Sequence, residues 1–376
     1  PWVHWDALAG RYVITGIVEH YETNLKALGV SFMDPVMQRG PSAWRMVEVG
    51  PGQILAPLDK PAFTLGEVIN GKRELYVTGH RISTSQLLWA RSMDGGDTWT
   101  GGLETSVTQV GFTSPTALGG SPLFVSYLGE AVQSVRRHRF IQGTDSGSGV
   151  SFATMMTNAS DPLVVQPRAD GIADFIPFPA AAGAGWSIFP NLAVDPLDPN
   201  NVLHFVYHDV VDPLATGEKD VNVYYRKLTR NAGTGFWTAG PEILVNDDNA
   251  LTVTDQFLPC IVVGPDGTVH VAFYDDRDYE QLDKGHPMYD ASLVRCNVYY
   301  AFKRPEDPSF TINQNWKLYL TDPSPTDPPA MNFAHSVPIG TYYPGEYFGI
   351  SIKDDNATDP VYEIWISYPG RADDPA

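Results

Sequence analysis

The chain has 376 residues, of which 43% are hydrophobic and 12% aromatic, with 34 glycines and 31 prolines. This composition supplies a large core and many tight turns, as a fold of many short strands requires. The 44 acidic residues outnumber the 25 basic ones, which gives a net charge of −19. Such a charge repels nucleic acids and anionic lipids, and no apolar run approaches the ~20 residues of a membrane-spanning helix.

Six hairpin-like units follow one another along the chain. Each consists of two β-rich runs joined by a turn that is rich in Asp, Gly or Pro. In chain order the paired runs are Trp2–Trp5 with Arg11–Ile14, Ala62–Leu65 with Leu75–Thr78, Ser114–Ala117 with Leu123–Ser126, Phe189–Val194 with Val202–Tyr207, Phe257–Val263 with Thr268–Tyr274, and Tyr347–Ile350 with Tyr362–Ile366.

A third and a fourth β-rich run follow the hairpin in several units, for example Leu87–Arg91 in the second unit and Glu242–Asn246 in the fourth. Self-similar groups of four strands predict an all-β propeller rather than a sandwich. We expect one domain over residues 1–376 with six blades, the last incomplete because few residues follow its second run. Seven blades are the alternative, since the pattern is blurred between Gly129 and Gly185. The expected blades lie near 1–56, 57–110, 111–183, 184–250, 251–322 and 341–376.

One loop carries a motif. Ser92–Trp99 reads Ser-Met-Asp-Gly-Gly-Asp-Thr-Trp. In this sequence the Asp94 carboxylate is expected to accept hydrogen bonds from turn amides, Gly96 to adopt a positive φ, and Trp99 to pack on the blade. The motif resembles the Asp box of bacterial BNR-repeat, exo-sialidase-like propellers. Together with the hairpin series, this resemblance covers most of the chain, and Thr229–Trp237 is similar to a degraded copy with Asn231 in place of Asp94.

The resemblance implies a site on the face where the loops before each first strand meet the loops after each second strand. In sialidases an arginine cluster holds a substrate carboxylate, a tyrosine activated by a glutamate is the nucleophile, and an aspartic acid transfers protons. Carried over to this chain, the expected catalytic residues are Asp59, Tyr343 and Glu346. The expected substrate-binding residues are Arg81, Arg277, Arg371, His208, Asp209 and Gln256.

Two features leave alternatives open. No Phe-Arg-Ile-Pro motif occurs near the N-terminus, although sialidases carry one. Clusters such as Asp276-Arg277-Asp278 also fit salt bridges between blades that have no catalytic role.

No motif requires a cofactor, but carboxylate-rich turns provide the oxygen ligands that Ca²⁺ prefers. The residues expected to hold such a metal are Asp247, Asp255 and Asp276. Solvated acidic turns are the alternative explanation for the same residues.

The two cysteines, Cys260 and Cys296, are expected to lie in the first and third strands of one blade. Two strand spacings place them about 10 Å apart, which is too far for a disulfide. We therefore expect two free thiols.

Two functions are consistent with these features. The first is a secreted propeller, located outside the cell or in the periplasm, that binds a glycan or a protein partner. It could form part of a larger chain or assembly. The alternative is a carbohydrate-active enzyme, a glycoside hydrolase of the sialidase type or a polysaccharide lyase, with its site on the loop-rich face.

Overall fold

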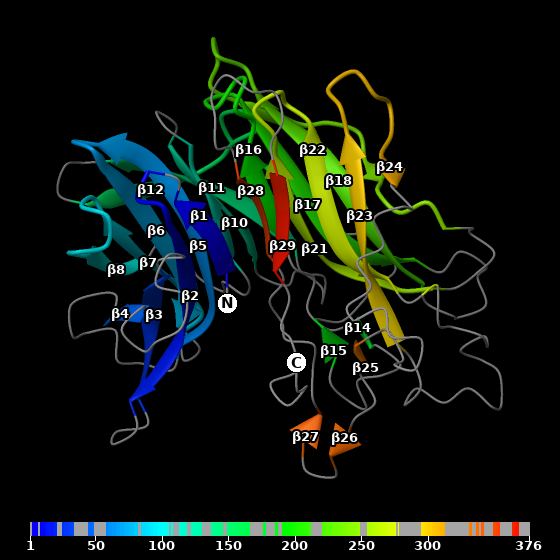
Figure 1. Cartoon of the computed structure of the whole chain (residues 1–376). Coiled ribbons are helices and arrows are strands. Elements are labelled where there is room, and N and C mark those ends of the chain that lie inside the picture. Colours follow the sequence, from blue (N-terminus) through cyan, green and yellow to red (C-terminus); the bar gives the residue numbers. More distant parts are fainter. Residues whose placement is uncertain are drawn as a thin grey trace.

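The computed structural model describes residues 2–6, 8–20, 25–33, 44–48, 58–81, 84–104, 107, 113–118, 122–129, 137–145, 149–165, 176–177, 185–186, 190–211, 220–248, 254–275, 277, 295–312, 331–332, 336–337, 340–341, 349–353 and 363–367. The regular elements of these residues are all β-strands (Figure 1). No helix within them is long and apolar enough to span a membrane.

Five antiparallel sheets each contain a path of four strands, and we call them blades 1 to 5. Blade 1 contains β1 (Trp2–Asp6), β2 (Arg11–His20), β3 (Leu25–Met33) and β4 (Trp44–Glu48). Blade 2 contains β5 (Leu58–Ile69), β6 (Lys72–Arg81), β7 (Gln86–Ser92) and β8 (Thr100–Glu104). Blade 3 contains β9 (Thr113–Thr116), β10 (Leu123–Leu128), β11 (His138–Asp145), β12 (Val150–Thr154) and β13 (Val164–Val165).

Blade 4 contains β16 (Asn191–Val194), β17 (Val202–Val211), β18 (Asp220–Arg230), β19 (Trp237–Ala239) and β20 (Ile243–Leu244). Blade 5 contains β21 (Gln256–Val263), β22 (Val269–Asp275), β23 (Arg295–Lys303), β24 (Thr311–Ile312) and β25 (Met331–Asn332). Three two-stranded sheets remain: β14 (Ile176–Pro177) with β15 (Gly185–Trp186), β26 (Ser336–Val337) with β27 (Gly340–Thr341), and β28 (Gly349–Lys353) with β29 (Glu363–Ser367).

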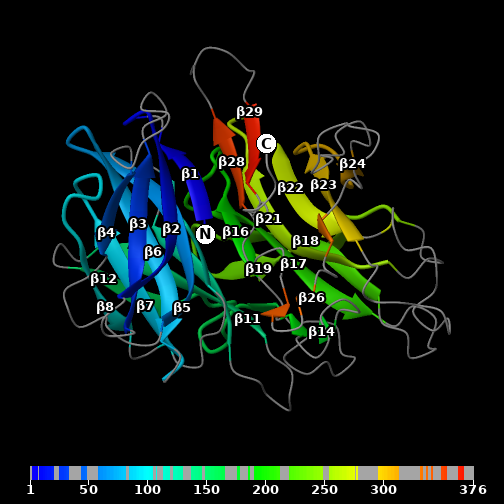
Figure 2. The same cartoon turned by 60° about the horizontal axis from the view of Figure 1, so that its bottom comes forward.

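The first strands of the sheets form a ring. In chain order β1, β5, β9, β16, β21 and β28 each contact the next, and β28 contacts β1. Figure 2 shows β1, β16, β21 and β28 around the middle of the molecule. Sheets of consecutive antiparallel strands arranged about an axis in this way make an all-β propeller.

The expected blade count, six with the last one incomplete or alternatively seven, is only partly met by the described residues. They contain five sheets with a four-strand path, and the place of the sixth blade holds only the two-stranded sheet β28–β29. The hairpins themselves are confirmed, for example by the antiparallel pairing of β16 with β17 and of β21 with β22.

Each blade has two ends. At one end the first strand begins and the second strand finishes, as the register pairs Asp59↔His80 and Gln256↔Asp275 indicate. We call this end of the blades the loop face. The opposite end carries the first hairpin turns, such as Gly264–Gly267, where the Gly267 amide donates to the Gly264 carbonyl at 2.9 Å. We call that end the turn face.

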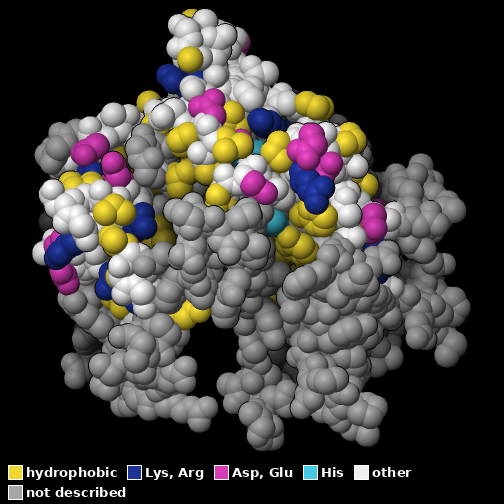
Figure 3. All heavy atoms as spheres, turned by 45° about the horizontal axis from the view of Figure 1, so that its top comes forward, with side chains coloured by type: hydrophobic (Ala, Val, Ile, Leu, Met, Phe, Trp, Pro, Cys, Tyr) yellow, Lys and Arg dark blue, Asp and Glu magenta, His cyan; other side chains and the backbone are white. Residues whose placement is uncertain are grey.

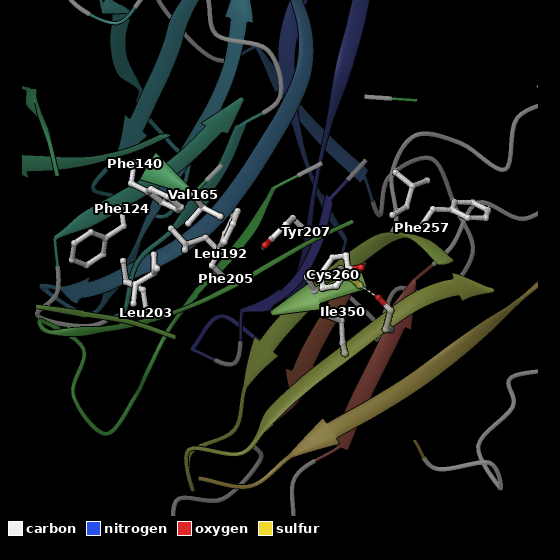
Figure 4. Packing of buried hydrophobic residues seen from close by; sticks show 14 of the residues in the cluster. Phe124, Phe140, Val165, Leu192, Leu203, Phe205, Tyr207, Phe257, Cys260 and Ile350 are labelled. Carbon is white, nitrogen blue, oxygen red and sulfur yellow. Dashed lines mark hydrogen bonds between the residues drawn. The ribbon is translucent and has the colours of Figure 1, made fainter. Parts of the chain in front are cut away.

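The core lies between the blades. The ring of Phe205 (β17) meets Phe140 (β11) edge to face (Figure 4), with centroids 5.0 Å apart. The rings of Phe124 (β10) and Trp237 (β19) meet likewise at 5.5 Å. All four side chains are buried. Removing such aromatic surface from water contributes most of the stability of a fold without disulfides. The thiol of Cys260 is free and buried, as predicted, and the Cys296 side chain lies outside the described residues.

The Ser92–Trp99 loop has the expected local structure. Asp94 accepts hydrogen bonds from the Thr98 amide at 2.8 Å and from the Thr98 hydroxyl at 2.6 Å. Gly96 has a φ of +95°, and the Trp99 indole donates to the Gly96 carbonyl at 3.2 Å. Burial opposes ionisation of Asp94, but the hydrogen bonds from Thr98 and Ser92 outweigh it and lower its pKa to about 2. Trp99 also packs against the hydrophobic cluster that contains Phe32 and Phe63. The three predicted structural roles are confirmed.

The loop at Asn231 is built differently. Its side-chain oxygen accepts from the amides of Gly233 at 2.9 Å and Thr234 at 3.1 Å, two and three residues on. Asp94 instead reaches the amide four residues on. The two loops therefore share a position in the blade and a buried or half-buried tryptophan, but not the same hydrogen bonds.

Charged side chains of both signs lie beside one another on the face that Figure 3 shows, and hydrophobic side chains lie between them. Among the exposed residues, Lys72 and Asp97 form an ion pair at 3.0 Å.

Candidate functional site

A connected set of polar side chains lies at the loop-face end of the seam between blades 4 and 5. We call it the blade 4–5 network. Most of its members are buried, and it is joined by the hydrogen bonds described below. Its members are Asp220, Asn222, Asn246, Asp247, Asp248, Thr254, Asp255, Gln256, Asp275 and Arg277.

Arg277 connects the two blades. Its Nε donates to Asp275 Oδ2 at 2.8 Å, and its Nη1 donates to Asp247 Oδ1 at 2.6 Å. The guanidinium lies over the ring of Tyr299, 4.6 Å from the centroid. Asp275 ends β22 of blade 5, whereas Asp247 follows β20 of blade 4. The predicted alternative of a salt bridge between blades is therefore present at Arg277.

Asp275 is fully buried beside this arginine. Burial raises its pKa to about 6, because the hydrogen bonds from the Arg277 side chain and amide offset only part of the cost of desolvation. Asp248 raises the pKa further by its negative charge. A carboxyl group with such a pKa exchanges its proton near neutral pH.

The segment from blade 4 to blade 5 carries a chain of hydrogen bonds. The Asn246 amide donates to Asn222 Oδ1 at 2.6 Å and also to Asp248. The Thr254 hydroxyl donates to Asp248 at 2.8 Å, and the Gln256 amide donates to Thr254 at 3.0 Å. Gln256 Oε1 is buried and accepts no hydrogen bond from the described residues.

Two further carboxylates extend the network to the start of β18. Asp255 accepts from the Val221 amide at 3.2 Å, and Asp220 accepts from the Asn222 side chain at 2.6 Å. The network thus contains five carboxylates and one guanidinium, so oxygen acceptors prevail over donors. Such a set is suited to hold a ligand that donates hydrogen bonds.

The predicted site residues are only partly brought together. Arg277 and Gln256 belong to the blade 4–5 network. Arg81 ends β6 in blade 2, and its Nε is buried without a hydrogen-bond partner among the described residues. Asp59 of β5 pairs with His80 of β6, and the side chain of Asp59 lies outside the described residues. Tyr343, Glu346, Arg371 and Asp276 lie outside the described residues, so their roles remain predictions.

The structure corrects the expected location of His208 and Asp209. The sequence placed them in a loop after β17, but this strand continues to Val211 and pairs with β18 along its whole length. Both side chains are buried inside the sheet. Burial lowers the pKa of His208 to about 3, so its imidazole is neutral at physiological pH. His208 and Asp209 lie in a strand rather than in a loop because the β-branched residues Val210 and Val211, which follow them, favour extended structure.

The predicted calcium ligands do not form a metal cluster among the described residues. Asp247 is bound to Arg277 and Asp255 to the Val221 amide. No group of three or more His, Cys, Asp or Glu side chains in the described part of the chain is placed to hold a metal ion. Asp276, the third expected ligand, lies outside it.

Four members of the network were not singled out from the sequence, namely Asp220, Asn222, Asp248 and Thr254. Asp220 and Asn222 belong to the Asp-Val-Asn at the start of β18 and Asp248 belongs to the run Asn246-Asp-Asp-Asn249, whereas Thr254 lies in neither run. Cross-strand and inter-blade contacts decide which of these polar residues meet, and the sequence pattern does not contain them.

No family model matches the chain, and no curated protein matches it. Several solved structures do. The NanB sialidase of Streptococcus pneumoniae matches with 12% identity and a TM-score of 0.42, over 76% of this chain and 37% of that chain. An ulvan lyase matches with 10% identity and a TM-score of 0.46, over 83% of this chain and 70% of that one. The α-L-arabinofuranosidase of Lactobacillus brevis matches with 14% identity and a TM-score of 0.43, over 84% and 92%.

This chain thus spans well under half of the sialidase chain that it matches. At these identities and scores neither an activity nor a substrate of this protein follows from the similarity.

Proposed function

We propose that this protein is a carbohydrate-binding propeller that holds a hydroxyl-rich glycan at the loop-face end of the seam between blades 4 and 5. The observation that carries the proposal is the excess of oxygen acceptors in the blade 4–5 network, including the unpartnered Oε1 of Gln256. Sugar hydroxyls donate hydrogen bonds to such acceptors. The Tyr299 ring beneath Arg277 fixes the side chain that joins the two blades.

The proposal includes the finer features that the sequence predicts. We propose that β28 and β29 begin a sixth blade, that the chain is related to the BNR-repeat propellers, and that it acts outside the cell. The Ser92–Trp99 loop supports the second point because its hydrogen bonds match the roles predicted for an Asp box. The net charge of −19 supports solubility in an extracellular setting.

Calorimetric titration with oligosaccharides tests the proposal. The panel contains sialyllactose, ulvan oligosaccharides and arabino-oligosaccharides, which correspond to the substrates in the names of the matching structures. We expect at least one of them to bind, and Asp247→Asn to weaken binding by about tenfold, the effect of losing one charged hydrogen bond. Asp247 is suitable because its side chain is 44% exposed.

The matched control is Asp97→Asn. It also removes one carboxylate charge, but from the exposed pair with Lys72 in blade 2 rather than from the blade 4–5 network. Binding by this variant is expected to equal that of the unmodified protein. If no member of the panel binds, or if both variants lose affinity alike, the proposed site is wrong.

An enzyme is the second candidate function. It is favoured by Asp275, whose pKa of about 6 is suited to general acid or base catalysis. Product formation from the same panel distinguishes the two functions, because a binding module releases every oligosaccharide unchanged. Tyr343→Phe is the variant that tests the predicted nucleophile.

A further inference from the structure

Several partly buried arginines among the described residues contact a carboxylate. Arg11 and Arg73 both lie near Asp6, at 3.6 and 3.5 Å. Arg226 pairs with Glu242 at 3.2 Å, and Arg277 pairs with Asp247. These pairs offset the cost of removing a guanidinium from water.

Arg81, Arg137 and Arg139 differ from these arginines, and among the three only Arg137 and Arg139 lie two residues apart. Arg137 directly precedes β11 and Arg139 lies in it. Both are partly buried, and the Nε atom of each is buried without a hydrogen-bond partner among the described residues. No carboxylate of the described residues pairs with either side chain. No described carboxylate therefore offsets the cost of partly removing these two guanidinium groups from water.

The two side chains share one side of the strand. Residues two apart in a strand point to the same face of the sheet, so Arg139 and Ile141 share one face of β11. The hydrogen bond from the Gly129 amide to the Arg137 carbonyl continues the pairing one residue beyond Leu128↔His138, so Arg137 follows the same alternation. Ile141 packs in a cluster with Tyr76 and Leu87 of blade 2. The arginines therefore occupy the loop-face end of the seam between blades 2 and 3, which is a different seam from that of the blade 4–5 network.

The local backbone leaves room for Arg139. A Cβ atom at Gly129 would lie 2.7 Å from Cδ and 3.0 Å from Nε of Arg139. The Gly129 amide donates to the Arg137 carbonyl at 2.9 Å, which holds this glycine beside both arginines. Tyr127 is the cross-strand partner of Arg139. His138, between the arginines, points to the other side and packs on Phe205 and Tyr207 of blade 4.

We propose that Arg137 and Arg139 form a binding site for an oxyanion, a carboxylate or sulfate group, at the loop-face end of the seam between blades 2 and 3. Guanidinium groups bind such groups through paired N–H donors. The site is separate from the proposed glycan site and does not depend on it. The anion is either free in solution or carried by a sugar, and the two sources share the same chemistry.

Calorimetric titration of the full chain with sodium sulfate, glucuronate and glucose, at constant ionic strength, tests the proposal. We expect sulfate or glucuronate to bind and glucose not to bind. Binding of sulfate but not of glucuronate assigns a free anion, and tighter binding of glucuronate assigns a sugar-borne one. The double variant Arg137→Gln/Arg139→Gln is expected to lose at least tenfold in affinity.

Two further variants make the result specific. Arg230→Gln removes one positive charge from the end of β18, where no nitrogen of Arg230 is buried without a partner, and it should bind as the unmodified protein does. Arg139→Lys keeps the charge but removes the planar fork, and it should weaken binding while leaving the fold intact.

The proposal is overturned if neither anion binds the unmodified chain, or if Arg230→Gln loses as much affinity as the double variant. If the double variant does not fold, the unmodified protein and Arg139→Lys still decide the question. Equal affinity of these two for the anion would also contradict a guanidinium site.

Discussion

At the scale of single residues, Asp94 organises a whole loop. Its carboxylate accepts from the amide and the hydroxyl of Thr98 and from the hydroxyl of Ser92 at 2.8 Å. The Ser92 hydroxyl in turn accepts from the Gly96 amide at 2.7 Å. These bonds use backbone donors that have no strand partner, so one acidic side chain replaces the ladder hydrogen bonds at this turn.

We predict that Asp94→Ala lowers the free energy of unfolding by about 1–2 kcal/mol, as the loss of a capping carboxylate does. Urea denaturation followed by tryptophan fluorescence measures the change. Asp97→Ala is the control, since Asp97 is exposed in the same loop and pairs with Lys72, and its loss is expected to cost less than about 0.5 kcal/mol. Equal effects of the two variants would contradict the role assigned to Asp94.

At the scale of elements, the loop between β7 and β8 connects two blades. Gly96 lies against the ring of Phe32 in β3 of blade 1, so closely that a Cβ atom at this position would overlap the ring. Arg11 of blade 1 also donates to the Gly95 carbonyl at 2.5 Å. The loop of blade 2 therefore reaches its neighbour, and its glycine is required both for the positive φ and for the contact.

We predict that Gly96→Ala lowers the free energy of unfolding by about 2–4 kcal/mol, because strain at a positive φ adds to overpacking against Phe32. Gly71→Ala is the matched control, with a φ of +76° and no heavy atom within 4 Å of the added Cβ. It should cost only about 1 kcal/mol. Equal losses in urea denaturation would mean that the contact with blade 1 contributes nothing.

At the scale of the whole molecule, histidines buried between blades make stability depend on pH. His138 and His208 are fully buried. Burial lowers the pKa of each to about 3, and for His138 the neighbouring His208 lowers it further. Above pH 6.5 these histidines are neutral in both the folded and the unfolded chain. Below it the unfolded chain binds protons that the folded chain does not, so stability falls as the pH decreases from about 6.5 toward 3.

We predict that His138→Leu reduces this pH dependence by about 1.4 kcal/mol per pH unit between pH 6 and pH 4. The measurement is the free energy of unfolding from urea denaturation at several pH values, compared between the variant and the unmodified chain. Asp275 has a raised pKa of about 6 and therefore stabilises the folded chain as the pH decreases over this range, opposite to the histidines. This contribution is the same in the variant and in the unmodified chain, so it cancels in the comparison. An unchanged slope would contradict a neutral, buried His138.

Much of the fold is determined by local sequence. Alternating apolar runs and turns such as Gly264–Gly267 predict the hairpins, and the composition of Ser92–Trp99 predicts the hydrogen bonds of its loop. These features depend on residues close together in the chain, which interact in the same way whatever surrounds them. The all-β propeller follows from their repetition.

The candidate site and the number of complete blades were decided by the tertiary structure. Arg277 meets Asp247 across 30 residues, and His208 and Asp209 are buried because β17 extends through Val211. Arg137 and Arg139 have no carboxylate partner among the described residues. Each outcome depends on which blades lie side by side and how far a strand continues. Such contacts join distant parts of the chain, so no local pattern of residues specifies them.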